Sequence, residues 1–96
     1  MLRITVTTRP QGTEITLEGR VVGPWAAELL ACWQRLGATA QRPIRVDLDG
    51  VLFIDAAGRA ALREMRAAGA VLAARGVMMR AVADEITATC TNDRDR

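Results

Sequence analysis

Three segments of the chain alternate between apolar and polar residues, and this pattern limits the possible folds more than any other feature. They span residues 2–7, 15–21 and 44–49, and apolar side chains occupy every second position apart from Gly19. Alternation of this kind predicts strands with one buried face and one face in water. A parallel sheet covered on both sides would instead show continuous apolar runs. We therefore expect an α/β domain in which a small mixed sheet carries helices on one face.

The segments between these strands indicate how the chain connects them. Residues 9–12 contain Pro and Gly and predict a turn, so the first two strands should form a hairpin. Gly23 and Pro24 predict the start of a first helix, and Gly37 predicts its end. The expected buried face of this helix has apolar residues at spacings of four, four and three: Trp25, Leu29, Trp33 and Leu36. This helix would form the crossover to a parallel third strand.

A second helix is expected over about residues 57–75, and Gly76 would end it. Its expected apolar stripe consists of Ala61, Leu62, Met65, Ala68 and Leu72. Gly69 lies within that stripe, either as a point of close approach to the sheet or as a tolerated accident. Residues 77–82 are expected to form a fourth strand, and Asp84 and Glu85 to open a short last helix. We expect a single domain over residues 1–90 and a disordered polar tail over 91–96.

The composition argues against an enzyme. The 96 residues include no His, Ser, Tyr or Lys, which removes the Ser–His and Cys–His pairs and the Schiff-base amine. We predict no catalytic residue, no cofactor and no metal site. Asp47, Asp49 and Asp55 could suggest a magnesium site of the phosphorelay-receiver kind, but the Lys that receivers need is absent. Capping and hydrogen bonding are the favoured roles for these three acids.

Charge and hydropathy exclude other classes. The net charge is +2, the arginines are scattered, and the three aromatic residues (Trp25, Trp33 and Phe53) lie in apolar patterns, so no nucleic-acid partner is expected. No N-terminal signal pattern and no apolar run of membrane-spanning length occurs, which predicts a cytoplasmic protein without direct membrane insertion. Cys32 and Cys90 have no metal-site spacing and are expected to be free thiols.

Residues 46–58 combine the third strand with an acidic and small-residue corner that opens the second helix. Asp55 is a candidate N-cap, whose carboxylate would accept hydrogen bonds from amides two or three residues later. Ala56, Ala57 and Gly58 would leave those amides open to a partner or an anion. From spacing alone, a docking surface and a simple capped helix start are equally supported.

The same stretch, from Val46-Asp47-Leu48-Asp49-Gly50 through Phe53-Ile54-Asp55-Ala56-Ala57-Gly58, resembles the signature of STAS domains. This family comprises sulphate-transporter domains and anti-sigma factor antagonists, and its members typically read Val-Asp-Leu-Ser-Gly-Val-x-Phe-Ile-Asp-Ser-Ser-Gly-Leu here. The resemblance to the antagonists implies a bacterial protein. Residues 17–20 and 73–77 also match, so the resemblance covers about residues 2–88. It implies a small mixed sheet with helices on one face and a regulatory role through protein binding. In the family, the unmodified corner docks on a partner, often an anti-sigma factor that is a serine kinase, and phosphorylation of the second signature Ser disrupts docking.

Carried over residue by residue, Asp55 and Gly58 match the signature, whereas the phosphoacceptor position falls on Ala57 and the Ser before it on Ala56. Neither alanine can accept phosphate. Arg59 also departs, because the family usually has an apolar residue there. The resemblance therefore implies partner binding by Asp55, Ala56, Ala57, Gly58 and Arg59, without a serine switch.

The partner is left open at this stage. It could be an anti-sigma factor related to serine kinases, or the chain could be a small cytoplasmic STAS subunit of a membrane transporter complex, such as one for lipids. Arg59, Arg63 and Arg66 share one helical face, which could meet an acidic surface but is better explained as a solvated face. A homodimer through the open sheet face or an edge strand is also possible.

Overall fold

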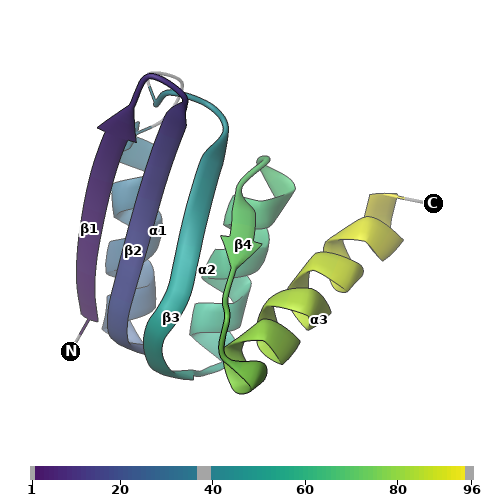
Figure 1. The fold of residues 1–96 in the computed structure, drawn as a ribbon. Coiled ribbons are helices and arrows are strands. Elements are labelled where there is room, and N and C mark those ends of the chain that lie inside the picture. Colours follow the sequence, from purple (N-terminus) through teal and green to yellow (C-terminus); the bar gives the residue numbers. More distant parts are fainter. Residues whose placement is uncertain (1, 37–39, 95–96) are drawn as a thin grey trace.

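The computed structural model describes residues 2–36 and 40–94, with side chains as far as residue 88. Its sheet has four strands in the order β1 (Leu2–Arg9), β2 (Gly12–Val21), β3 (Ile44–Ile54) and β4 (Val71–Ala73). β1 and β2 are antiparallel, whereas β2–β3 and β3–β4 are parallel. The predicted hairpin, crossover and mixed sheet are therefore confirmed (Figure 1).

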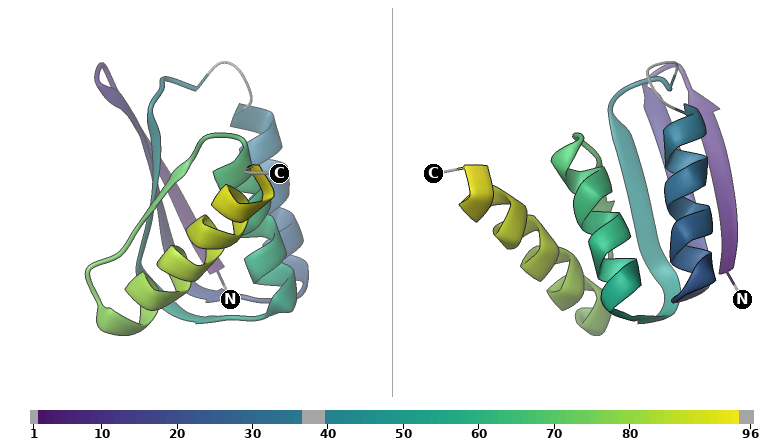
Figure 2. Two further views of the ribbon diagram at one scale, coloured as in Figure 1. Left: turned by 90° about the vertical axis from the view of Figure 1, so that its right-hand side faces the viewer. Right: turned by 180° about the vertical axis from the view of Figure 1, so that it is seen from behind.

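The helices are α1 (Pro24–Leu36), α2 (Ala56–Ala67) and α3 (Val77–Arg94). Two views at right angles show α1 and α2 side by side on one face of the sheet, while α3 lies beside α2, past the β4 edge (Figure 2). The opposite face of the sheet carries no helix of the described chain. Helices on one face are what one-sided alternation requires, because only one row of side chains in each strand is apolar.

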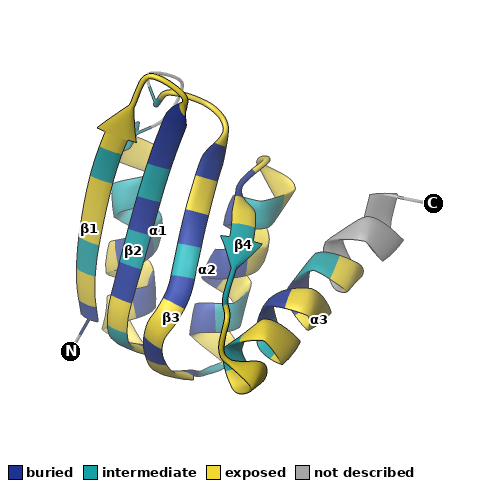
Figure 3. Ribbon diagram, in the orientation of Figure 1, coloured by how far each residue is buried: buried dark blue, intermediate teal, exposed yellow. Residues whose placement is uncertain are grey.

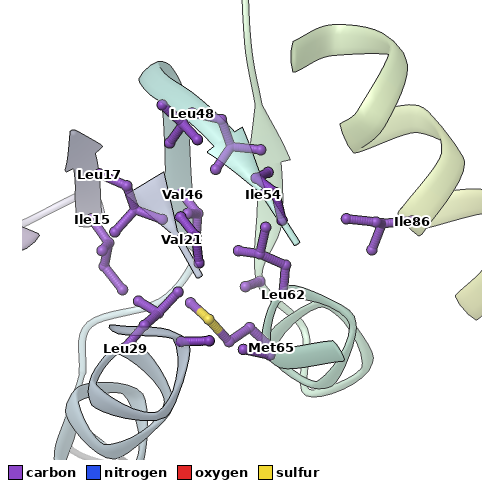
Figure 4. Close-up of a cluster of buried hydrophobic side chains, with 14 of the residues drawn as sticks. Ile15, Leu17, Val21, Leu29, Val46, Leu48, Ile54, Leu62, Met65 and Ile86 are labelled. Atoms are coloured by element: carbon purple, nitrogen blue, oxygen red, sulfur yellow. The ribbon is translucent and has the colours of Figure 1, made fainter. Parts of the chain in front are cut away.

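The core lies between the sheet and the helices (Figure 4). Buried residues alternate with less buried ones over residues 13–18 of β2 and 44–49 of β3 (Figure 3), which confirms the period-two pattern there. Each large side chain that is fully buried contributes about 1.5–3 kcal/mol relative to an exposed one. Those with almost no exposed surface are Ile15, Leu17, Val21, Leu29, Ile44, Val46, Leu48, Leu62, Met65 and Ile86.

The expected buried face of α1 is confirmed except in the first turn. Leu29 is buried, and Trp33 and Leu36 are partly buried against the core, but Trp25 is exposed and Ala26 takes the buried place in the first turn. Gly37, the expected stop, lies outside the described residues.

The second helix ends at Ala67, so the expectation that it reaches residue 75 is wrong. Gly69 adopts φ +110°, which a residue with a side chain rarely does, and the chain reverses there. Its amide donates to the carbonyl of Arg66 at 3.0 Å. Gly69 therefore terminates α2, and it is neither a close-approach point inside the helix nor an accident. Of the expected stripe, Ala61, Leu62 and Met65 are buried, Ala68 is exposed and Leu72 belongs to β4.

The fourth strand is β4, and the expectation of a strand over 77–82 is wrong. Residues 77–82 form the first turns of α3, and Gly76 precedes that helix. Four apolar residues at helical spacing, Met79, Val82, Ala83 and Ile86, pack on the core from α3. Asp84 and Glu85 consequently lie inside α3 and do not open a last helix. α3 continues to Arg94, residues 95 and 96 lie outside the described range, and a domain boundary at residue 90 remains a prediction.

Candidate functional site

Asp55 caps α2 as the sequence predicts. It has extended backbone angles (φ −90°, ψ −172°), and its Oδ1 accepts a hydrogen bond from the amide of Gly58 at 2.8 Å. Its backbone carbonyl accepts from the amide of Arg59 at 2.9 Å, which closes the first turn. A cap of this kind contributes about 1 kcal/mol to helix stability. The orientation of the corner is therefore fixed by short local bonds.

The second carboxylate oxygen of Asp55 links two helix starts, which local sequence patterns do not reveal. Oδ2 accepts from the amide of Gly23 at 3.0 Å, just before α1. The amide of Asp55 itself donates to the carbonyl of Val21 at 3.3 Å. One acidic residue thus binds the end of β2, the start of α1 and the start of α2 together.

Gly58 is required by close packing. Its position is buried, and a Cβ atom built there would lie 2.1 Å from the carbonyl oxygen of Val21 and 2.8 Å from Cγ2 of Ile54. Real Cβ atoms essentially never approach other atoms so closely, and the nearest neighbour is backbone that cannot rotate away. The absence of a side chain at Gly58 therefore lets the first turn of α2 rest directly on the end of β2.

Ala56 and Ala57 are exposed in the first turn of α2. The amides at the start of any helix lack intrahelical partners, and here the two outermost residues carry the smallest chiral side chains. We call the surface formed by Ala56 and Ala57 the ledge. The described part of α3 does not bury it. The first turn of α2 is therefore accessible from solvent at Ala56 and Ala57.

Arg59 is half-buried and turned toward α3, where it forms an ion pair with Glu85. Of the other arginines on the expected row, Arg63 is exposed and Arg66 is half-buried. The charge of Arg59 is thus already matched by an acid of the same chain, so the row is not a uniform cationic stripe.

Exposed apolar side chains flank the corner, and sequence reasoning missed them. Near the end of strand β3, Leu52 is 74 % and Phe53 55 % exposed. Trp25 is 38 % exposed at the start of α1. Val77 and Met78 are exposed at the start of α3. The end of β3 and the starts of all three helices lie at the same end of the molecule (Figures 1 and 3).

A signal for this exposure was available. Residues 51–54 are four consecutive apolar residues, and a strand with one open face cannot bury all of them. Val51 and Ile54 are buried, and Leu52 and Phe53 are both exposed, because the pairing with β2 shifts register between Val51 and Phe53 and leaves one extra residue in β3.

Asp47 and Asp49 serve as hydrogen-bond acceptors on the open face. Oδ1 of Asp49 accepts from the amides of Arg75 at 2.5 Å and Gly76 at 3.2 Å, and Oδ1 of Asp47 accepts from the amide of Asp49 at 2.9 Å. The bonds from Arg75 and then Gly76 lower the pKa of Asp49. Among the described residues, no group of three or more His, Cys, Asp or Glu side chains could hold a metal ion.

Comparison with known proteins gives a match in structure but not in sequence. No family model matches the chain, and no curated protein matches it. An anti-sigma factor antagonist from Mycobacterium paratuberculosis superposes with a TM-score of 0.70 and 18 % identity over 79 % of this chain and 69 % of that one. The unphosphorylated form of the anti-sigma factor antagonist SpoIIAA gives a TM-score of 0.61 and 22 % identity over 85 % and 80 %.

These likenesses define the class of fold. The chain has the STAS fold of anti-sigma factor antagonists, as the signature at residues 46–58 predicts. No helix of the described residues has the length and apolar character needed to cross a membrane.

Proposed function

We propose that the chain is a non-enzymatic regulatory module of the cytoplasm that binds a protein partner through its strand-to-helix corner. The docking surface comprises Asp55, Ala56, Ala57, Gly58 and Arg59, with Leu52 and Phe53 beside it. The observation that carries the proposal is the exposure of small and apolar side chains on a corner held rigidly by Asp55. Apolar side chains exposed together mark interaction sites more often than chance. The fold shared with anti-sigma factor antagonists supports an anti-sigma factor as the partner.

Docking at this surface is not switched by serine phosphorylation. Phosphorylation would add up to two negative charges to a hydroxyl group, but Ala56 and Ala57 have none. We therefore propose constitutive docking, whose extent depends on the concentrations of the two proteins.

The test is to introduce the charge that the chain lacks. Ala57→Asp places a carboxylate on the exposed ledge, and Ala67→Asp places the same group at the other, exposed end of α2 as a matched control. Affinity capture from native lysate should recover one protein with the wild type and with Ala67→Asp, and much less of it with Ala57→Asp. Circular dichroism would verify that both variants fold. Equal recovery by all three proteins would refute docking at the corner.

The identity of the captured protein decides between the two partner classes. A kinase-like anti-sigma factor supports the proposal, and incubating it with ATP and the wild type should leave the recovery of the complex unchanged. A transporter ATPase would instead assign the chain to a membrane transporter complex.

A further inference from the structure

One edge of the sheet is an unprotected strand. The sheet order places β1 outermost, and no described residue pairs with its outer side (Figure 1). β1 pairs with β2 in unbroken register from Leu2 to Arg9, without a bulge. Native proteins usually protect such an edge with a bulge, a proline, an inward-pointing charge or a very short strand. β4 follows that rule, since it has three residues, whereas β1 has eight.

The sequence of β1 favours further pairing. Residues 4–8 are five consecutive β-branched residues, Ile-Thr-Val-Thr-Thr, which are the types that fit a pleated sheet best. The charges of the strand are confined to Arg3 and Arg9 near its ends. They lie within 4.0 Å of Glu18 and 3.6 Å of Glu14 on β2, so their repulsion of an approaching strand is reduced. The centre of the edge is uncharged.

We propose that the β1 edge pairs antiparallel with the β1 edge of a second copy, about a twofold axis that passes beside Thr5. This inference is independent of the docking surface at the corner, which lies on other elements. The two sheets would become one continuous sheet, with the helices of both copies on the same face, because an axis perpendicular to the sheet preserves its sides.

The register follows from which side chains would face one another. With Thr5 opposite Thr5 of the second copy, Ile4 faces Val6 on the helix side and Arg3 faces Thr7 on the open side. Val6 is 37 % exposed and Ile4 partly buried, so this pairing removes apolar surface from water. A register centred on Val6 would set Arg3 opposite Arg9, and like charges directly opposite each other are destabilising.

A dimer built on one pair of strands buries a small area and belongs to the weak class of interfaces. It should therefore dissociate on dilution. An extended segment of another protein could add to the same edge, but β1 is complementary to itself in the Thr5 register, which favours the second copy.

Cross-linking tests the register. In Thr5→Cys, the two new thiols would face each other directly, so mild copper-catalysed oxidation should give a disulfide-linked dimer. In Thr7→Cys, the two thiols would be four residues apart along the strands, about 13 Å, which no disulfide spans. The wild type controls for the native thiols of Cys32 and Cys90. No link in Thr5→Cys, or equal links in both variants, would overturn the register.

A charge at the same place tests the association itself. Thr5→Arg would set two like charges opposite each other and should raise the dimer dissociation constant about fivefold or more in sedimentation equilibrium. Thr16→Arg is the matched control, because Thr16 neighbours Thr5 on the inner strand β2 and does not lie on the edge. A wild type that stays monomeric to about 1 mM, a concentration at which even a very weak dimer would form, would overturn the proposal, as would a dimer insensitive to Thr5→Arg. If the wild type is a monomer and Thr5→Arg abolishes the capture of another protein, the β1 edge pairs with a strand of that protein instead.

Discussion

Among the described glycines without a positive φ, Gly58 is the one at which substitution by alanine should destabilise the protein most. The added Cβ would lie 2.1 Å from the carbonyl oxygen of Val21, against roughly 3.4 Å for an ordinary van der Waals contact. The start of α2 must move away from β2 by about an ångström to relieve this overlap, and the movement strains the Asp55 bonds to Gly58 and Gly23. Overpacking of this kind costs about 1–3 kcal/mol, and we expect the upper part of that range.

Urea unfolding followed by circular dichroism measures this effect. With a slope of about 1 kcal/mol per molar urea for a domain of this size, the midpoint should fall by about 2–3 M. Gly76→Ala is the control, since no atom beyond the two adjacent residues lies within 4 Å of a Cβ built there, and it should lower stability by about 1 kcal/mol or less. A midpoint for Gly58→Ala within about 0.5 M of the wild type would refute the argument that close packing requires this glycine.

Three further predictions follow from the corner and the open face. Asp55→Ala should cost about 2 kcal/mol in urea unfolding, because it removes the acceptors of two amides, and Asp55→Asn should recover part of that loss. Phe53→Ser should change stability by less than about 0.5 kcal/mol, since Phe53 is exposed, but it should weaken partner capture; a large loss of stability would show that Phe53 belongs to the core. Asp49 should titrate below the ordinary aspartate pKa in NMR, because its ionised form accepts from Arg75 and Gly76. Because the pKa is lower in the folded state, ionised Asp49 stabilises the fold at pH values above the unfolded-state pKa, and this stabilisation is lost as the pH falls through the folded-state pKa. Asp49→Asn should remove this pH-dependent part of the stability. An unshifted titration of Asp49 would contradict the prediction.

The elements that the sequence predicts well are those set by local periodicity. The strands β1, β2 and β3 each alternate over six residues or more, and Pro24 and Asp55 are local start signals for α1 and α2. The cap at Asp55 and the small residues after it were predictable because a helix N-cap involves residues within one turn. The resemblance at 46–58 predicts the fold class independently of periodicity.

The elements that the sequence predicts poorly are those decided by distant contacts. β4 is too short to show a period, and residues 77–82 form an apolar run that fits a strand or a helix equally well. The choice is made by pairing with β3 and by the bonds of Asp49 to amides 26 and 27 residues away. In the site, the bond from Gly23 to Asp55 spans 32 residues, and the Arg59–Glu85 pair depends on where α3 lies.

The double use of the Asp55 carboxylate limits how any partner can recognise the corner. Each of its oxygens already accepts an amide of this chain, at 2.8 and 3.0 Å. An incoming arginine or lysine would share these oxygens with two bonds that hold the fold together, and each oxygen has one lone pair left to offer it. Selectivity at this point should therefore come more from shape, through backbone approach over two methyl groups, than from charge.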